Sequence, residues 1–215
     1  MISALRTLIP AACLLILPAC SSIYYDTMER FGVEKREILV DRVEDAREAQ
    51  GEAQEEFKSG LEEVRSVVSF DGGELETRYN RLSKAYDRME GEADSVRSRI
   101  SDIERVANAL FREWESELDQ YSDGNLRAQS AQQLTATRLR YGEVIAAMNR
   151  AAERMDPVLE IYSDQVLFLK HNLNARAIST LETERVEIEA RVEALLREMD
   201  AAIIEANAFI SEMGV

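Results

Sequence analysis

Residues 75–121 read LETRYNRLSKAYDRMEGEADSVRSRISDIERVANALFREWESELDQY, and the spacing of their apolar side chains decides the fold. Steps of four and three residues alternate strictly along this stretch. The positions in this register are Leu75, Tyr79, Leu82, Tyr86, Met89, Ala93, Val96, Ile100, Ile103, Ala107, Leu110, Trp114, Glu117 and Tyr121. A strict seven-residue repeat keeps one stripe against a partner helix through left-handed supercoiling. The segment is therefore predicted to be a long, coiled-coil-like helix.

Turn sequences border this helix on both sides. FDGGE at 70–74 and YSDGN at 121–125 combine Gly, Asn and Asp, which accept positive φ or bond back to nearby amides. A less regular stripe precedes the first turn and predicts a helix over residues 24–69. Its members are Tyr24, Met28, Phe31, Lys35, Ile38, Arg42, Ala46, Ala49, Ala53, Phe57, Gly60, Val64 and Val67.

Two cations, Lys35 and Arg42, fall on the apolar stripe of that first helix. Either their long stems snorkel so that the charges reach water, or they pair with buried acids and fix the register of the helices. We favour snorkelling. The small residues at the centre of the stripe would let a neighbouring helix approach closely.

Two further stripes follow the second turn. The first holds its register straight across Pro157, which favours a kinked helix over a reversal there. Its members are Leu134, Arg138, Tyr141, Ile145, Met148, Ala152, Met155, Leu159, Tyr162, Val166, Leu169 and Leu173. The last stripe consists of Ile188, Val192, Leu195, Met199, Ala202, Ala206 and Phe209. The fifteen residues between 173 and 188 do not fit the repeat, so a turn is expected at 169–175.

The predicted fold class is all-α, an elongated antiparallel bundle of four long helices. The four segments would span about 46, 47, 46 and 40 residues, and near-equal lengths let each helix be covered along its length. The alternative has three helices, the last of them long and kinked at Pro157.

The N-terminus reads as an export signal. The run up to Ala19 is apolar but shorter than the roughly 20 residues that span a bilayer, and it follows one basic residue, Arg6. Leu17, Pro18 and Ala19 lead directly into Cys20. This pattern resembles the bacterial lipobox, which implies diacylglycerol attachment at the cysteine and removal of the signal. We expect a signal peptide over 1–19, a single helical-bundle domain over 20–215 and a lipid anchor on Cys20.

The net charge and the cysteine count limit the kinds of partner that we expect for this chain. The chain carries a net charge of −15, which opposes contact with nucleic acid phosphate and anionic lipid headgroups. Cys20 would be the one thiol left after cleavage, because Cys13 lies in the signal, so no disulfide is expected within the mature chain. The acyl chains alone would then hold the protein at the membrane.

Three strings in the mature chain resemble a family of Gram-negative lipoproteins that is described as a domain of unknown function. They are GVEKREILVDRVEDAREAQ at 32–50, FREWESELDQY at 111–121 and DQVLFLKHNLNARAI at 164–178. The resemblance spans nearly the whole mature chain and implies an all-helical lipoprotein, without any catalytic residue to transfer. In such lipoproteins Ser21, next to the modified cysteine, implies the outer membrane over the inner one.

The sequence offers little for catalysis. His171 is its single histidine, no Glu-x-x-His pair is present, and no phosphate-binding glycine loop is found. We therefore expect no enzyme activity, metal or cofactor. His171, Asn172 and Asn174 interrupt the most apolar stretch of the chain. They either cap helix ends at a turn or form a polar cluster that awaits a partner.

These observations predict a non-enzymatic scaffold or adaptor. It would be anchored to the outer membrane on its periplasmic face and would bind another envelope protein or itself. The alternative is a periplasmic carrier whose bundle opens to hold an apolar ligand or lipid.

Overall fold

The computed structural model describes residues 35–69 and 75–213, and these residues form four α-helices. The helices are α2 (Lys35–Val68), α3 (Leu75–Leu118), α4 (Gly124–His171) and α5 (Ala175–Met213). No strand occurs within the described ranges. The predicted all-α class and the count of four helices are confirmed. The predicted signal peptide, Cys20 and the expected start of the first helix at residue 24 lie outside the described residues.

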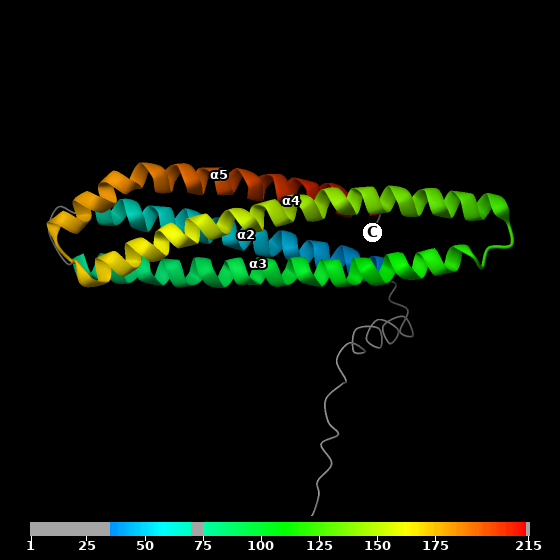
Figure 1. Ribbon diagram of the computed structural model, residues 1–215, viewed down its shortest axis with the longest axis horizontal. Helices are drawn as coiled ribbons and strands as arrows, with labels where there is room; N and C mark the ends of the chain where they lie inside the picture. Colours follow the sequence, from blue (N-terminus) through cyan, green and yellow to red (C-terminus); the bar gives the residue numbers. More distant parts are fainter. Residues whose placement is uncertain (1–34, 70–74, 214–215) are drawn as a thin grey trace, which may run out of the picture. The chain divides into compact units, whose positions relative to one another are not determined.

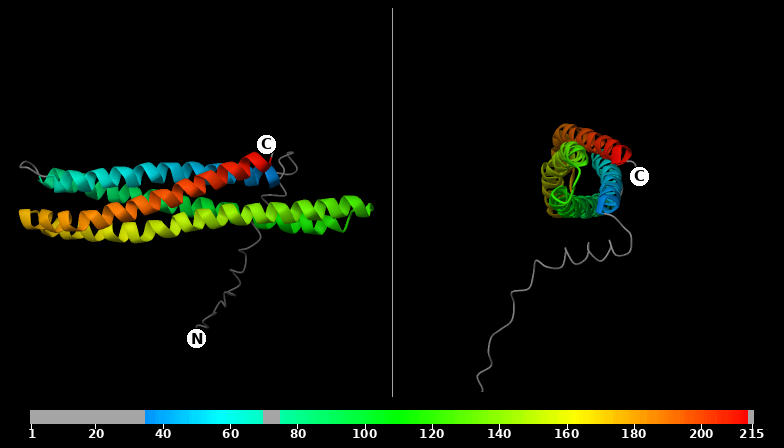
Figure 2. Two further views of the ribbon diagram at one scale, coloured as in Figure 1. Left: turned by 90° about the horizontal axis from the view of Figure 1, so that it is seen from above. Right: turned by 90° about the vertical axis from the view of Figure 1, so that its right-hand side faces the viewer.

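The four helices form an antiparallel bundle in which each helix packs on the helix before it and α5 closes the ring against α2 (Figure 1). The view along the bundle axis shows the helices around a common centre (Figure 2). The longest helix, α4, has 48 residues, which corresponds to about 72 Å at 1.5 Å per residue. None of the described helices has an apolar stretch long enough to cross a bilayer.

The register predicted for 75–121 is the buried face of α3 over most of its length. Its buried members are Leu82, Met89, Ala93, Val96, Ile100, Ile103, Ala107 and Leu110. The register stays intact beyond Leu110, but burial does not, because Trp114 is partly exposed and Tyr121 is 43% exposed. The part of α3 that follows Glu113 extends past the first residue of α2, Lys35, which contacts Glu113.

The last two stripes belong to two separate helices. α4 continues through Pro157 without a reversal and ends at His171, and the turn predicted at 169–175 follows at Asn172–Asn174. The alternative of three helices is therefore wrong. Every predicted member of the final stripe is buried in α5: Ile188, Val192, Leu195, Met199, Ala202, Ala206 and Phe209.

The buried face of α2 is wider than the predicted stripe. Leu39, Val40, Val43 and Leu61 are also buried, because α2 packs against both α3 and α5. Gly60 marks a close approach on this face. A Cβ atom at position 60 would lie 2.6 Å from the sulfur of Met89 on α3 and 3.4 Å from the Tyr162 ring on α4.

The core also contains one neutral polar side chain, Gln50 of α2. It is 0% exposed, and neither of its amide atoms has a hydrogen-bond partner within the described part of the chain. A buried polar group without a partner costs about 1–3 kcal/mol of desolvation. Gln50 therefore opposes folding at the centre of an otherwise apolar face.

We predict that Gln50→Met raises the free energy of unfolding by about 1 kcal/mol, because an unbranched apolar side chain of similar length replaces the unpartnered amide. Urea unfolding of the purified protein measures this change. Gln54→Met is the matched control: Gln54 lies one turn along α2, is partly exposed and donates to Asp200 at 2.6 Å. Its change should stay within about 0.5 kcal/mol. A Gln50→Met protein less stable than the wild type would contradict the prediction.

Candidate functional site

The polar cluster predicted at 171–174 forms the turn between α4 and α5. His171 is the last residue of α4, and Asn172 caps that end while its side-chain nitrogen donates to the carbonyl oxygen of Phe168 at 2.9 Å. Asn174 caps the start of α5, since its side-chain oxygen accepts from the backbone nitrogens of Arg176 at 3.0 Å and Ala177 at 3.2 Å. Both asparagines therefore have the capping role that the sequence offered as one of two alternatives.

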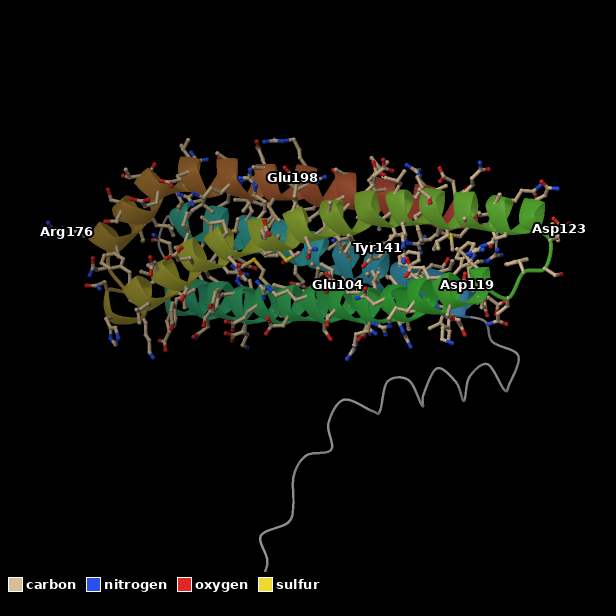
Figure 3. All side chains as sticks on the ribbon, turned by 45° about the vertical axis from the view of Figure 1, so that its right-hand side comes forward. Glu104, Asp119, Asp123, Tyr141, Arg176 and Glu198 are labelled. Carbon is tan, nitrogen blue, oxygen red and sulfur yellow. The ribbon has the colours of Figure 1, made fainter. Side chains whose placement is uncertain are left out.

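Apolar side chains project from the same turn. Leu167, Phe168 and Leu173 are 58%, 39% and 40% exposed, whereas Leu169 between them is fully buried. Leu173 was predicted to lie in the core stripe, and that prediction is wrong because the residue falls in the turn after α4 has ended. We call residues 167–176 the α4–α5 tip. It lies at one end of the bundle, marked by Arg176 in Figure 3.

The two predicted seam cations lie elsewhere, in the first half of α2. Lys35 is buried, with 7% of its side chain exposed, and its ammonium group donates to Glu113 of α3 at 3.0 Å. The expectation of snorkelling is therefore wrong for Lys35, which pairs with an acid instead. Arg42 keeps 32% of its side chain exposed and pairs with Asp45 on its own helix at 2.8 Å. Its charge thus reaches water at the edge of the seam.

Beyond the Lys35–Glu113 pair, α3 and α4 continue as a two-helix extension, residues 114–139. The extension carries the α3–α4 turn, which Asp123 caps through bonds from the backbone nitrogens of Asn125 and Leu126. Figure 1 shows this turn at the end of the bundle opposite to the α4–α5 tip. Between Gly124 and Glu143, Leu134 is the single buried residue.

Polar contacts hold the two helices of the extension together. The indole nitrogen of Trp114 donates to the Ser130 hydroxyl at 2.8 Å. Arg138 pairs with Glu115 at 2.5 Å, and this hydrogen bond lowers the pKa of the Glu115 carboxyl. At the base of the extension the Arg138 guanidinium lies 5.2 Å from the centre of the Phe111 ring. The extension is thus an ordered part of the fold that leaves Leu126 52% and Leu139 67% exposed.

Two open grooves run between α4 and α5. One, of about 270 Å³, lies beside Pro157 and Ala190 and is edged by Arg154, Glu187 and Arg191. The other, of about 540 Å³, is lined by Arg138, Leu139, Gly142, Glu143, Ala146, Arg150 and Glu205. Charged side chains at the rims and small residues at the floors make both grooves shallow features of a solvated surface, in contrast to the enclosed apolar sites that small ligands favour.

Two tyrosines of α4 have raised pKa values. Burial, with a smaller effect of Glu104, raises the pKa of Tyr141 to about 12, and Figure 3 shows these two residues facing each other. Burial also raises the pKa of Tyr162, so both phenols stay protonated at neutral pH. His171 is exposed at the turn, and no side chain in the described ranges is hydrogen-bonded to its ring. Within residues 35–69 and 75–213, no three His, Cys, Asp or Glu side chains are placed to hold a metal ion.

The structure therefore divides the predicted site residues. It brings His171, Asn172 and Asn174 together in one turn. Lys35 and Arg42 lie apart from this turn, in the first half of α2, and Cys20 lies outside the described residues. Sequence reasoning missed the surface role of Leu167 and Phe168. The signal was present in the apolar run 166–169, where four consecutive apolar residues exceed what one helix face can bury.

We predict that Asn174→Ala lowers the free energy of unfolding by about 1 kcal/mol, because two backbone N–H groups at the start of α5 lose their acceptor. Asn172→Ala should cost less, since its side chain makes a single hydrogen bond to a carbonyl. Urea unfolding compares both variants with Gln132→Ala, a change at an exposed position within α4 that should stay within about 0.5 kcal/mol. Equal losses in all three variants would refute the capping role.

Comparison with known proteins identifies the family. A family model described as "Protein of unknown function (DUF2959)" matches residues 24–213, which is nearly the entire chain. No curated protein and no solved structure matches the chain. The matched region includes all four helices, the extension and the α4–α5 tip. The chain therefore belongs to the DUF2959 family.

Proposed function

We propose that the protein is a membrane-anchored periplasmic lipoprotein that acts as a non-enzymatic scaffold or interaction adaptor in the cell envelope. Acyl chains on Cys20 would attach it to the outer membrane. The lipobox-like sequence before Cys20 and Ser21 after it support this placement. Two or more acyl chains hold a protein stably at a bilayer, because each buried methylene contributes about 0.8 kcal/mol.

The filled interior of the bundle supports a scaffold over a carrier. The seams bury large side chains along the whole bundle, among them Phe57, Met89, Tyr162, Leu195 and Phe209. A carrier would have to separate these helices and expose the seams to water, and each large side chain so exposed costs about 1.5–3 kcal/mol. Binding on the outside of the helices requires no such opening.

The two-helix extension is the observation that carries the proposal. Its apolar register continues from the core of α3, and within the described residues neither α2 nor α5 reaches it. Lys35 marks the first described residue of α2, and Glu212 near the end of α5 pairs with Arg140 at 2.6 Å. A helix from another envelope protein would complete the extension in the same way that α2 and α5 complete the bundle. A second copy of the chain could supply that helix as well.

We predict that a photo-crosslinking residue at Leu126 captures a discrete partner in intact cells, whereas the same residue at Glu153, exposed at the middle of α4, does not. Mass spectrometry of the adduct identifies the partner or a second copy. Purified protein should then lose binding to that partner when Leu126 and Leu139 are changed to serine. The variant Val186→Ser/Ile204→Ser, with 65% exposure at both positions on α5, is the control. Equal loss in both variants would contradict this site.

We also predict that Cys20→Ala abolishes incorporation of a fatty acid analogue and lowers the share of the protein in the membrane fraction, because the cysteine sulfur is the atom that would carry the lipid. Cys13→Ala should still take up label, since Cys13 lies within the segment that is removed. Labelling followed by membrane fractionation measures both effects. Label on the Cys20→Ala protein would refute the anchor.

A further inference from the structure

The α4–α5 tip has the densest group of exposed apolar side chains in the described part of the chain. Leu167, Phe168 and Leu173 lie within seven residues of one another. The other large apolar side chains that are exposed are spread over the bundle: Tyr121, Leu126, Leu139, Val186 and Ile204. Isolated exposed apolar residues are normal, but a cluster beside polar residues marks an interaction surface.

The charge at this tip differs from that of the chain as a whole. The chain has a net charge of −15, yet residues 165–181 contain no acid and two cations, Lys170 and Arg176. Neither cation forms an ion pair within residues 35–69 and 75–213, whereas Arg127 and Arg138 in the extension pair with Asp119 and Glu115 at 2.5 Å. The cations of the tip are therefore available to an anionic partner.

The side chains of Asn172 and Asn174 are hydrogen-bonded within the turn. Asn174 accepts two backbone N–H groups, and the Asn172 side chain donates to the carbonyl oxygen of Phe168. The backbone nitrogen of Asn172 also donates to the carbonyl oxygen of Leu169 at 3.1 Å. Polar groups with partners cost less to remove from water than groups without them. The turn can therefore enter a less polar medium with its caps intact.

We infer that the α4–α5 tip binds the surface of an anionic phospholipid bilayer. Leu167, Phe168 and Leu173 insert at the boundary between headgroups and acyl chains, and Lys170 and Arg176 contact the phosphates. Basic residues beside large apolar ones are the composition of interfacial membrane anchors. A second copy fits this tip less well, because its own Lys170 and Arg176 would bring like charges together.

The acidic flanks of the bundle do not prevent this contact. Asp164 lies six residues before Lys170, or about 9 Å along α4, and Glu182 lies six residues after Arg176, or about 9 Å along α5. These distances exceed the Debye length of about 8 Å at physiological ionic strength. Among the described residues at the same end, α3 begins with Glu76 and Arg78, whose charges are opposite. The contact does not depend on Cys20, and it would give the protein a membrane site distinct from its N-terminus.

An environment-sensitive fluorophore tests this inference on the full chain with Cys13 and Cys20 changed to serine. It is attached at His171→Cys in one sample and at Ser122→Cys, in the exposed α3–α4 turn, in a control sample. Vesicles contain phosphatidylcholine alone or with phosphatidylglycerol. We expect a blue-shifted, brighter emission at position 171 with the anionic vesicles only, and a loss of that response at high salt. No response at 171, an equal response to both lipids or an equal response at 122 would overturn the inference.

Two variants separate the contributions of charge and insertion. Lys170→Gln/Arg176→Gln should weaken vesicle binding roughly 30-fold, because each cation near an anionic surface contributes a factor of about five. Leu167→Ser/Phe168→Ser/Leu173→Ser should abolish the blue shift while circular dichroism shows unchanged helix content. Val186→Ser/Ile204→Ser should leave binding unchanged. A blue shift that appears without vesicles and grows with protein concentration would show self-association and overturn the bilayer as the occupant.

Discussion

The need to keep the apolar seam of each helix out of water governs this structure. A helix of 44 residues such as α3 cannot bury its stripe against itself, so the seven-residue repeat requires partners along most of its length. α2 and α4 provide them, and α5 completes the ring. The small residues Ala46, Ala49, Ala53 and Gly60 let α2 approach closely, and Met89 and Tyr162 fill the space opposite Gly60. Close packing of this kind leaves little freedom to change one helix without moving its neighbours.

The same requirement explains why the ends of the bundle differ from its middle. The helices are unequal, so α3 and α4 extend past the Lys35–Glu113 and Arg140–Glu212 contacts. Along the extension the apolar register persists while burial falls, and polar contacts such as Trp114 to Ser130 hold the two helices together instead. At the opposite end the helices reverse, and α4 cannot bury all four apolar residues of 166–169 on one face. Surfaces available for binding therefore arise where seam coverage stops.

The seam registers of α3 and α5 could be predicted from the sequence because the repeat is strict and the partners are long. Tyr121 and Leu173 could not be placed correctly, since periodicity does not indicate where a neighbouring helix ends. The first seam positions of α5 were missed for a different reason. Ala177 and Leu181 are buried in phase with Ile188. Glu184 occupies the seam position between Leu181 and Ile188 and interrupts the apolar pattern. Pairing of Lys35 with Glu113 joins positions 78 residues apart, which no local pattern reveals.

The effect of a charged side chain in this bundle depends more on its neighbours than on the total number of charges. Most of the ion pairs join partly exposed side chains, such as Arg88 and Glu56 at 2.8 Å, and pairs of this kind contribute little to stability. The chain has an acid-free stretch within α4, at 124–142, and another that joins the end of α4 to the start of α5, at 165–181, and the sequence alone does not distinguish them. In the first, Arg127, Arg138 and Arg140 are neutralised by acids from neighbouring segments. In the second, Lys170 and Arg176 have no such neighbour among the described residues, and they flank exposed apolar side chains. The two stretches thus differ electrostatically, because the packing of the described residues brings acids to the arginines of the first stretch and to neither cation of the second.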